Sequence, residues 1–137
     1  MGALSLFLFS YIMEIKSHFD HVNFNVTDLD RSIKFYKEAL GLEKVGEINH
    51  PEGDFKIVYL SRPGENFRLE LTWLRDHPQA YELGENESHL AMKVEGDYDA
   101  IREYHRQMGC ICFENEAMGL YFIHDPDDYW IEILKYS

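Results

Sequence analysis

The sequence is built from two similar halves. Residues of the first half fall on chemically similar residues 68 positions later, and this offset holds from His21 to Gly41. Near the C-terminus the offset falls to 62, so the second copy contains a shorter loop. A chain with such a repeat is expected to fold into two similar modules that pack together. The aligned pairs are His21 with His89, Val22 with Leu90, Phe24 with Met92, Val26 with Val94, Ile33 with Ile101, Tyr36 with Tyr104, Leu40 with Met108, Gly41 with Gly109 and Glu70 with Glu132.

Each copy has the pattern of a strand, a helix and further strands. Alternating apolar residues predict the strands, and apolar residues at helical spacing precede Gly41, which is placed as a helix C-cap. Thr27 followed by Asp30 resembles a capping box at the start of this helix. The prediction is an α+β domain over 13–137 with two tandem βαβββ modules, one over about 18–74 and one over about 86–135. Predicted strands cover 21–26, 55–60, 67–73, 89–94, a short segment around 112, 120–124 and 129–134, and the second helix lies near 97–108.

The first twelve residues are expected to lie outside this domain. The run over 3–13 is apolar but too short to span a bilayer. It also lacks the basic start and the small-residue cleavage site of a signal peptide. Met13 begins an ordinary polar stretch. We therefore expect residues 1–12 to come from an upstream start codon.

Charge and cysteine content narrow the expected partners and compartment. The net charge is −12, whereas nucleic acids and anionic membrane surfaces are bound through clustered lysines and arginines. Neither partner is therefore expected. Cys110 and Cys112 are too few and too close together to staple a secreted fold, which predicts a reducing cytoplasm. On a short apolar strand they are expected to be packing thiols.

Two histidines and two glutamates occupy equivalent positions in the two copies. Side chains alternate along a strand, so each of these residues projects from the face opposite an apolar stripe. A carboxylate among apolar neighbours is costly unless it is solvated, paired or bound to metal. Four strands that curl around one cavity would gather two imidazoles and two carboxylates, a full ligand set for one divalent metal. Paired structural polar groups are the alternative. The four residues are His21, Glu70, His89 and Glu132.

The other histidines are weaker candidates. His18, His50, His77 and His124 have no histidine at the equivalent position of the other copy. His105 follows the apolar Tyr104 on the second predicted helix and is expected at the surface.

Four segments together match a known pattern. They are HVNFNVTDLDRSIKFY over 21–36, LELT over 69–72, YELG over 81–84 followed by His89, and DPD from 125 followed by YWIEI up to 133. These segments resemble the glyoxalase I family, the lactoylglutathione lyases of the vicinal-oxygen-chelate superfamily. The resemblance covers about residues 18–135. It implies paired modules whose curled mixed sheets surround a metal-binding cavity, often shared between the two chains of a homodimer.

The resemblance also implies a ligand set and a reaction. The four metal ligands would be His21, Glu70, His89 and Glu132, a set similar to that of bacterial glyoxalase I. The compact loops resemble the branch that prefers nickel or cobalt; zinc is a further alternative. The reaction would convert the hemithioacetal of methylglyoxal and a thiol, glutathione by resemblance, to the S-lactoyl thioester. By the same resemblance Glu132 is the expected base, and Glu70 can serve on the opposite face of the substrate.

The sequence departs from the family where glutathione would bind. Asn25 stands where the family commonly has an arginine, and Leu74 stands where it commonly has an asparagine. The loop over 115–119 has no basic residue. Arg75 is a candidate to compensate, unless it is a solvated loop charge. The candidate substrate-binding residues are Asn25, Arg75 and Met118, and the thiol stays open.

Two other functions remain open at this point. One is another metalloenzyme of the same superfamily with a different small substrate. The other is a non-catalytic protein of the same fold that binds a small molecule without metal, although such a pocket has no need of two carboxylates.

Overall fold

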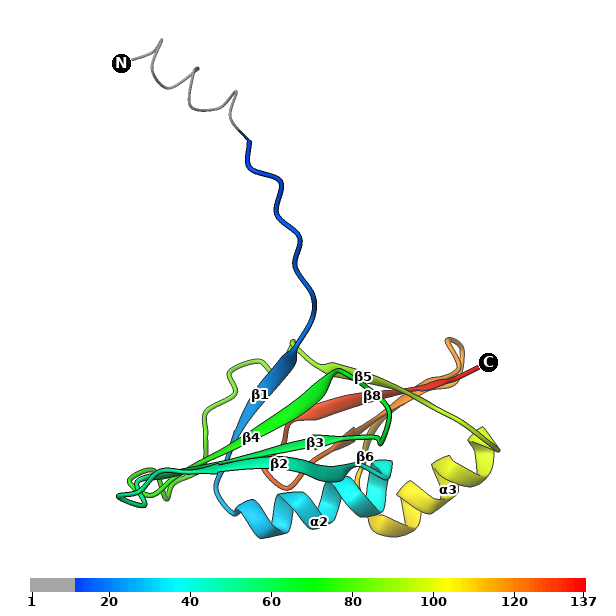
Figure 1. The fold of residues 1–137 in the computed structure, drawn as a ribbon. Coiled ribbons are helices and arrows are strands. Elements are labelled where there is room, and N and C mark those ends of the chain that lie inside the picture. The colour runs from blue at the N-terminus through cyan, green and yellow to red at the C-terminus, as the bar shows by residue number, and fades with distance from the viewer. Residues whose placement is uncertain (1–11) are drawn as a thin grey trace, which may run out of the picture.

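The computed structural model describes residues 12–137, and the chain forms two modules of one helix and four strands each. Figure 1 shows the two modules side by side. The expected extension over 1–12 lies outside the described residues except for Ile12. No helix of the described part is long and apolar enough to cross a membrane. The first module comprises β1 (His21–Val26), α2 (Leu29–Leu40), β2 (Glu43–Asn49), β3 (Phe55–Ser61) and β4 (Arg68–Leu74). The second comprises β5 (Leu90–Val94), α3 (Tyr98–Met108), β6 (Ile111–Asn115), β7 (Leu120–His124) and β8 (Trp130–Lys135).

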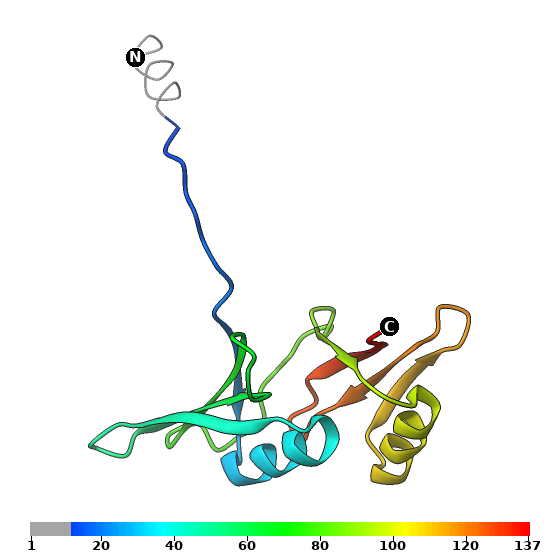
Figure 2. The same cartoon turned by 45° about the vertical axis from the view of Figure 1, so that its right-hand side comes forward.

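The two sheets have the same topology, which confirms the predicted pair of βαβββ modules. The strand orders are β1-β4-β3-β2 and β5-β8-β7-β6, with β1 parallel to β4 and β5 parallel to β8. Each sheet is open and ends in two edge strands. Figure 2 shows the strands of the two modules on either side of the molecule, above the two helices. A single chain therefore does not wrap its strands into one closed cavity.

The C-terminal ends of both helices lie where the sequence predicts them, but the predicted N-terminal cap of α2 needs correction. Gly41 and Gly109 are the C-caps, at φ of 67° and 72°, where a side chain would be strained. The predicted capping box from Thr27 to Asp30 is wrong. The N-cap of α2 is Asp28, whose carboxylate accepts a hydrogen bond from the Arg31 backbone amide.

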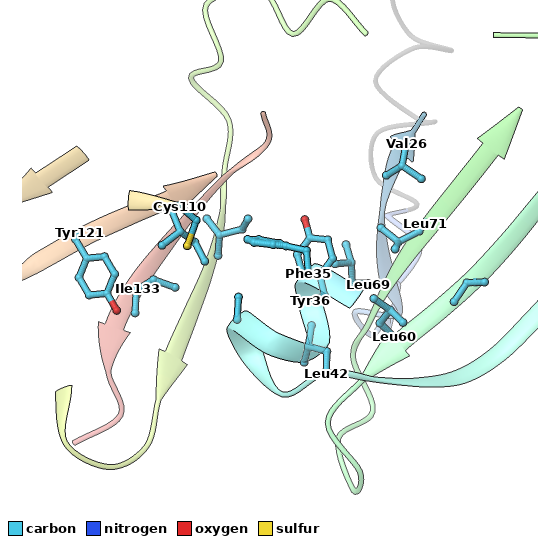
Figure 3. Close-up of a cluster of buried hydrophobic side chains, with 14 of the residues drawn as sticks. Val26, Phe35, Tyr36, Leu42, Leu60, Leu69, Leu71, Cys110, Tyr121 and Ile133 are labelled. Carbon is cyan, nitrogen blue, oxygen red and sulfur yellow. The ribbon is translucent and has the colours of Figure 1, made fainter. Parts of the chain in front are cut away.

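One hydrophobic core joins the modules. The aromatic side chains of Phe35 and Tyr36 project from α2 between the two sheets (Figure 3). Ile131 and Ile133 of β8 are fully buried from the second module, as Leu71 of β4 is from the first. The apolar stripes predicted by alternation therefore form the core, and the opposite face of each sheet carries the polar residues.

Polar contacts also hold the modules together. The Tyr36 hydroxyl donates to the carboxylate of the buried Asp125 at 2.7 Å. Asp127 accepts from both the backbone amide and the hydroxyl of Thr27, at 3.1 and 2.8 Å. Because Thr27 is engaged across this junction, it does not cap the helix beside it.

The expectation that His105 lies at the surface is wrong. Its ring is fully buried between the Tyr121 hydroxyl and the Ala39 carbonyl, each at 2.7 Å. A carbonyl can only accept, so Nε2 donates to Ala39, and Nδ1 accepts from Tyr121. Burial lowers the pKa of His105, which favours this neutral form. His105 thus links α3 to the end of α2.

The two cysteines behave as packing residues, as the sequence suggested. Both are free thiols; Cys110 is buried and Cys112 is half-buried. Burial raises the pKa of each thiol to about 11, so neither is a thiolate at neutral pH.

Candidate metal centre

The first module brings His21 and Glu70 together on the polar face of its sheet. β1 carries His21 and β4 carries Glu70, and the parallel register aligns Asn23 with Glu70. The Nε2 atom of His21 lies 3.5 Å from Oε2 of Glu70. The side chains are 36% and 13% exposed, so both are reachable from solvent. We call this pair half-site one.

The second module repeats this arrangement. His89 directly precedes β5, and Glu132 lies on β8. The Nε2 atom of His89 lies 3.9 Å from Oε1 of Glu132, with the side chains 38% and 19% exposed. We call this pair half-site two. The repeat in the sequence is thus a repeat in side-chain geometry.

The chain alone does not gather all four ligands. Among residues 12–137, no cluster of three or more histidine, cysteine, aspartate or glutamate side chains is placed to hold a metal ion. The four strands expected to curl around one cavity form two separate open sheets in one chain. Each sheet carries two of the four candidate ligands.

Each half-site nevertheless fits two adjacent positions around a metal. With bonds of about 2.1 Å, neighbouring ligand atoms lie roughly 3.0–3.4 Å apart in octahedral or tetrahedral geometry. The histidine–glutamate separations of 3.5 and 3.9 Å are slightly wider than this spacing. Nitrogen and oxygen donors of this kind suit first-row divalent metals.

Charged and polar groups surround half-site one. Nδ1 of His21 lies 2.6 Å from Oδ2 of Asp20, and Nη2 of Arg68 donates to the same oxygen at 2.9 Å. These hydrogen bonds, that of His21 first, hold the pKa of Asp20 below its ordinary value. The Arg68 guanidinium stacks over the Tyr59 ring at 4.3 Å. A hydrogen bond with Glu70 raises the pKa of the Tyr59 hydroxyl.

Aromatic groups surround half-site two instead. Phe122 is the cross-strand neighbour of Glu132, at the place that Tyr59 takes beside Glu70. The His89 ring meets the edge of Phe122 at a centroid distance of 5.0 Å. Trp130 packs on Phe122 at 5.6 Å. The two half-sites therefore share their histidine–glutamate pair but differ in the side chains around it.

The three candidate substrate-binding residues lie in different places. Asn25 is on the polar face of β1, and its side chain accepts a hydrogen bond from Asn23 at 2.8 Å. Arg75 follows β4 and is engaged by the Asp76 carboxylate and the Glu52 carbonyl. Met118 lies in the turn between β6 and β7 and is 72% exposed. The chain does not bring these three together.

An open groove of about 530 Å³ runs along the unpaired edge of β1 toward the start of β5. Its lining includes Asn23 from the first module, and His89 and Tyr129 from the second. The Tyr129 ring stacks on Phe24 at 4.2 Å. The groove thus lies between the edge of β1 and His89 of half-site two.

The model of the Glyoxalase/Bleomycin resistance protein/Dioxygenase superfamily matches residues 18–133. The chain belongs to this superfamily. Among its relatives, the lactoylglutathione lyase of Haemophilus influenzae is 32% identical over 124 residues, 84% of this chain and 90% of the relative. The lactoylglutathione lyase of Neisseria meningitidis is 31% identical over 122 residues, 84% of this chain and 88% of the relative.

Solved glyoxalase structures of the superfamily share the fold. The trypanothione-dependent glyoxalase I of Leishmania major superposes with a TM-score of 0.77 and 34% identity, covering 88% of this chain and 87% of that one. Glyoxalase I from Zea mays gives a TM-score of 0.73 and 27% identity, covering 85% of this chain and 44% of that one.

Sequence reasoning missed the residues around half-site one. Arg68 lies two positions before Glu70, so alternation along the predicted strand could have placed it on the ligand face. Tyr59 lies on a predicted strand, but its pairing with Glu70 depends on the register between strands. Asp20 carried no signal, since it precedes the alternating run.

Proposed function

We propose that this protein is a metal-dependent lyase of the glyoxalase I type. It would convert the hemithioacetal of methylglyoxal and a low-molecular-weight thiol to the S-lactoyl thioester. The observation that carries this proposal is the pair of repeat-equivalent His–Glu half-sites, in a chain whose relatives of similar length are lactoylglutathione lyases.

In this proposal one divalent metal is held by His21, Glu70, His89 and Glu132. When bound, such a cation polarises the vicinal oxygens of the substrate and stabilises the enediolate that forms on loss of a C–H proton. Nickel is the proposed ion, with cobalt and zinc as alternatives that the same donors accept. Two free thiols, one buried and one half-buried, are compatible with a reducing cytoplasm as the compartment.

We propose that a second copy of the chain completes the site. Each chain holds two separate half-sites, and the edge of β1 is unpaired and lies beside an open groove. In a homodimer, half-site one of one chain would face half-site two of its partner. Two symmetric sites would then form from four half-sites.

We propose Glu132 as the principal base. Its neighbour on β7 is the hydrocarbon ring of Phe122, whereas the neighbour of Glu70 on β3 is Tyr59, which carries a hydroxyl group. A carboxylate with no hydroxyl group beside it has its lone pairs available to take the substrate proton and return it to the neighbouring carbon. Glu70 lies in the opposite half-site and would face the other side of the substrate.

Two measurements test this proposal. Metal content of the purified full-length protein is determined first, and conversion of methylglyoxal is then followed with glutathione and with other thiols. Bound metal and turnover with at least one thiol are expected. Metal without turnover on any thiol would favour another superfamily metalloenzyme, and a metal-free protein that binds small molecules would favour the non-catalytic alternative.

The identity of the thiol is the open part of the reaction. Asn25 carries no charge, and the Arg75 guanidinium is engaged by Asp76 and by the carbonyl of Glu52. Neither of these two candidate residues therefore offers a free positive charge to a carboxylate of glutathione. Turnover with another thiol but not with glutathione would keep the chemistry and change the substrate.

A further inference from the structure

The two histidines of the half-sites are held in different ways. Oδ2 of Asp20 lies 2.6 Å from Nδ1 of His21 and accepts from Arg68 at 2.9 Å. The backbone amide of Arg68 also donates to the carbonyl of Asp20 at 3.1 Å. Asp20 is therefore tied to β4 through both its backbone and its side chain, so its carboxylate has a fixed place beside the ring.

This contact determines which nitrogen of His21 carries the proton. An ionised carboxylate only accepts hydrogen bonds, so Nδ1 must carry the hydrogen. In a neutral ring the lone pair is then on Nε2, the atom that lies 3.5 Å from Glu70. The His21 ring also makes a T-shaped contact with the Tyr59 ring at a centroid distance of 5.9 Å, and this contact limits rotation of the His21 ring. His21 is thus presented as an Nε2 ligand.

Half-site two has no counterpart of this support. At the repeat offset, Ser88 stands in place of Asp20 and Trp130 in place of Arg68. Among the described residues, no carboxylate accepts from Nδ1 of His89, whose only ionic neighbour is Glu132 at Nε2. The repeat therefore provides an internal comparison within one molecule.

We propose that Asp20 is a positioning residue of the metal centre, which fixes His21 in the Nδ1-protonated form with Nε2 directed to the metal. This inference rests on the proposed metal-dependent function. Carboxylates that hold a ligand histidine in this way increase metal affinity, and their loss typically costs about 10- to 100-fold. Half-site one is preorganised to bind metal, and half-site two is not.

The first test measures which ring nitrogen of His21 is protonated, and it requires neither bound metal nor enzymatic activity. Nuclear magnetic resonance of the metal-free full chain, with nitrogen-15 in the histidine rings, reports which nitrogen is protonated at neutral pH. Wild type is expected to show His21 protonated at Nδ1, and Asp20→Ala a mixture of both forms. Asp20→Glu should restore the wild-type pattern, and Ser88→Ala should leave His21 unchanged. His21 protonated at Nε2 in wild type would overturn the proposal.

The second test measures affinity for Co²⁺ and Ni²⁺ by titration of the metal-free protein. Asp20→Ala is expected to lower affinity about 10-fold or more, whereas Ser88→Ala leaves it unchanged. Ser88→Asp, which gives half-site two the same carboxylate, is expected to raise it. Asp20 is two-thirds exposed, so the thermal midpoint of the metal-free protein should not move.

The two proposals fail in different ways. If wild type binds metal and turns over substrate but Asp20→Ala binds metal equally tightly, only the role of Asp20 is wrong. If wild type binds no divalent metal, the proposed function fails and the role of Asp20 fails with it.

Discussion

Glu70 and Glu132 are equivalent in the repeat, but their cross-strand neighbours differ, and the proposed function assigns the role of base to Glu132. We expect Glu132→Gln to reduce kcat by about 10²–10⁴-fold, the usual contribution of a general base. Glutamine keeps an oxygen donor, so part of the metal should remain bound. Glu70→Gln, the matched variant in the other half-site, should lose less turnover. Metal content and kcat measured on both variants check this, and near-wild-type activity of Glu132→Gln would refute the assignment.

Asp125 makes the stability of the folded state depend on pH. The residue is 2% exposed, and burial raises its pKa to about 6 from an ordinary value of 3.8. The folded state therefore binds this proton more tightly than the unfolded chain. Its protonation adds stability as the pH falls through about 6, and the effect is complete below about 4. The added stability is up to about 3 kcal/mol, at 1.36 kcal/mol per unit of pKa.

The variant Asp125→Asn isolates this contribution, since its side chain does not titrate. Urea denaturation of wild type and variant between pH 4 and 7.5 gives the difference in unfolding free energy at each pH. This difference should shift in favour of wild type as the pH is lowered from 7 to 4. A difference that stays constant over this range would show that folding does not raise the pKa of Asp125.

Single residues differ in how far the sequence alone could place them. The two pairs, His21 with Glu70 and His89 with Glu132, could be expected on one face of each sheet because the repeat and the strand alternation point to them independently. The burial of His105 could not be expected, because its neighbours along α3 say nothing about the α2 carbonyl that accepts its hydrogen bond. A buried polar residue whose partner is distant in sequence has no local signature.

At the scale of elements, strand β2 shows where sequence patterns stop being informative. β1, β3 and β4 each carry an apolar stripe that packs on the core, and the sequence predicted all three. β2 is an edge strand whose residues are nearly all exposed, so it has no buried stripe to reveal it. Its pairing with β3 holds it in place, and pairing leaves little trace in composition.

The side chains on the two faces of β5 also lead to a prediction about how the thiol part of the substrate binds. Leu90, Met92 and Val94 pack against the core, so Ala91 and Lys93 project from the ligand face of the sheet. Lys93 lies at the repeat offset from Asn25 and is exposed. We expect Lys93→Ala to raise KM about fivefold for substrates whose thiol carries a carboxylate, and to change kcat little.

A matched control lies on the neighbouring strand. Lys135 of β8 pairs with Val94 and lies over the Tyr98 ring, on the other face of the same sheet. Lys135→Ala should therefore leave KM unchanged. Steady-state kinetics with glutathione and with an uncharged thiol separate the two cases; an equal effect of both substitutions would mean that Lys93 does not contact the substrate.

At the scale of the whole molecule, the arrangement of half-sites determines whether two inactive variants can rescue each other. His21→Ala removes a ligand from half-site one, and His89→Ala removes one from half-site two, so each variant alone should lack an intact site. In a dimer that contains one chain of each kind, the intact half-site one of the second chain meets the intact half-site two of the first. One complete site is then restored.

Mixing the two variants in equal amounts under conditions that exchange subunits should therefore recover about a quarter of the wild-type activity, since half of the dimers are mixed and each holds one intact site. Mixtures of either variant with itself stay inactive, and cross-linking of the two chains should follow the recovery of activity. If instead each chain built its own complete site, every site in the mixture would lack one histidine. Activity would then not return, and the sharing of sites between chains would be wrong.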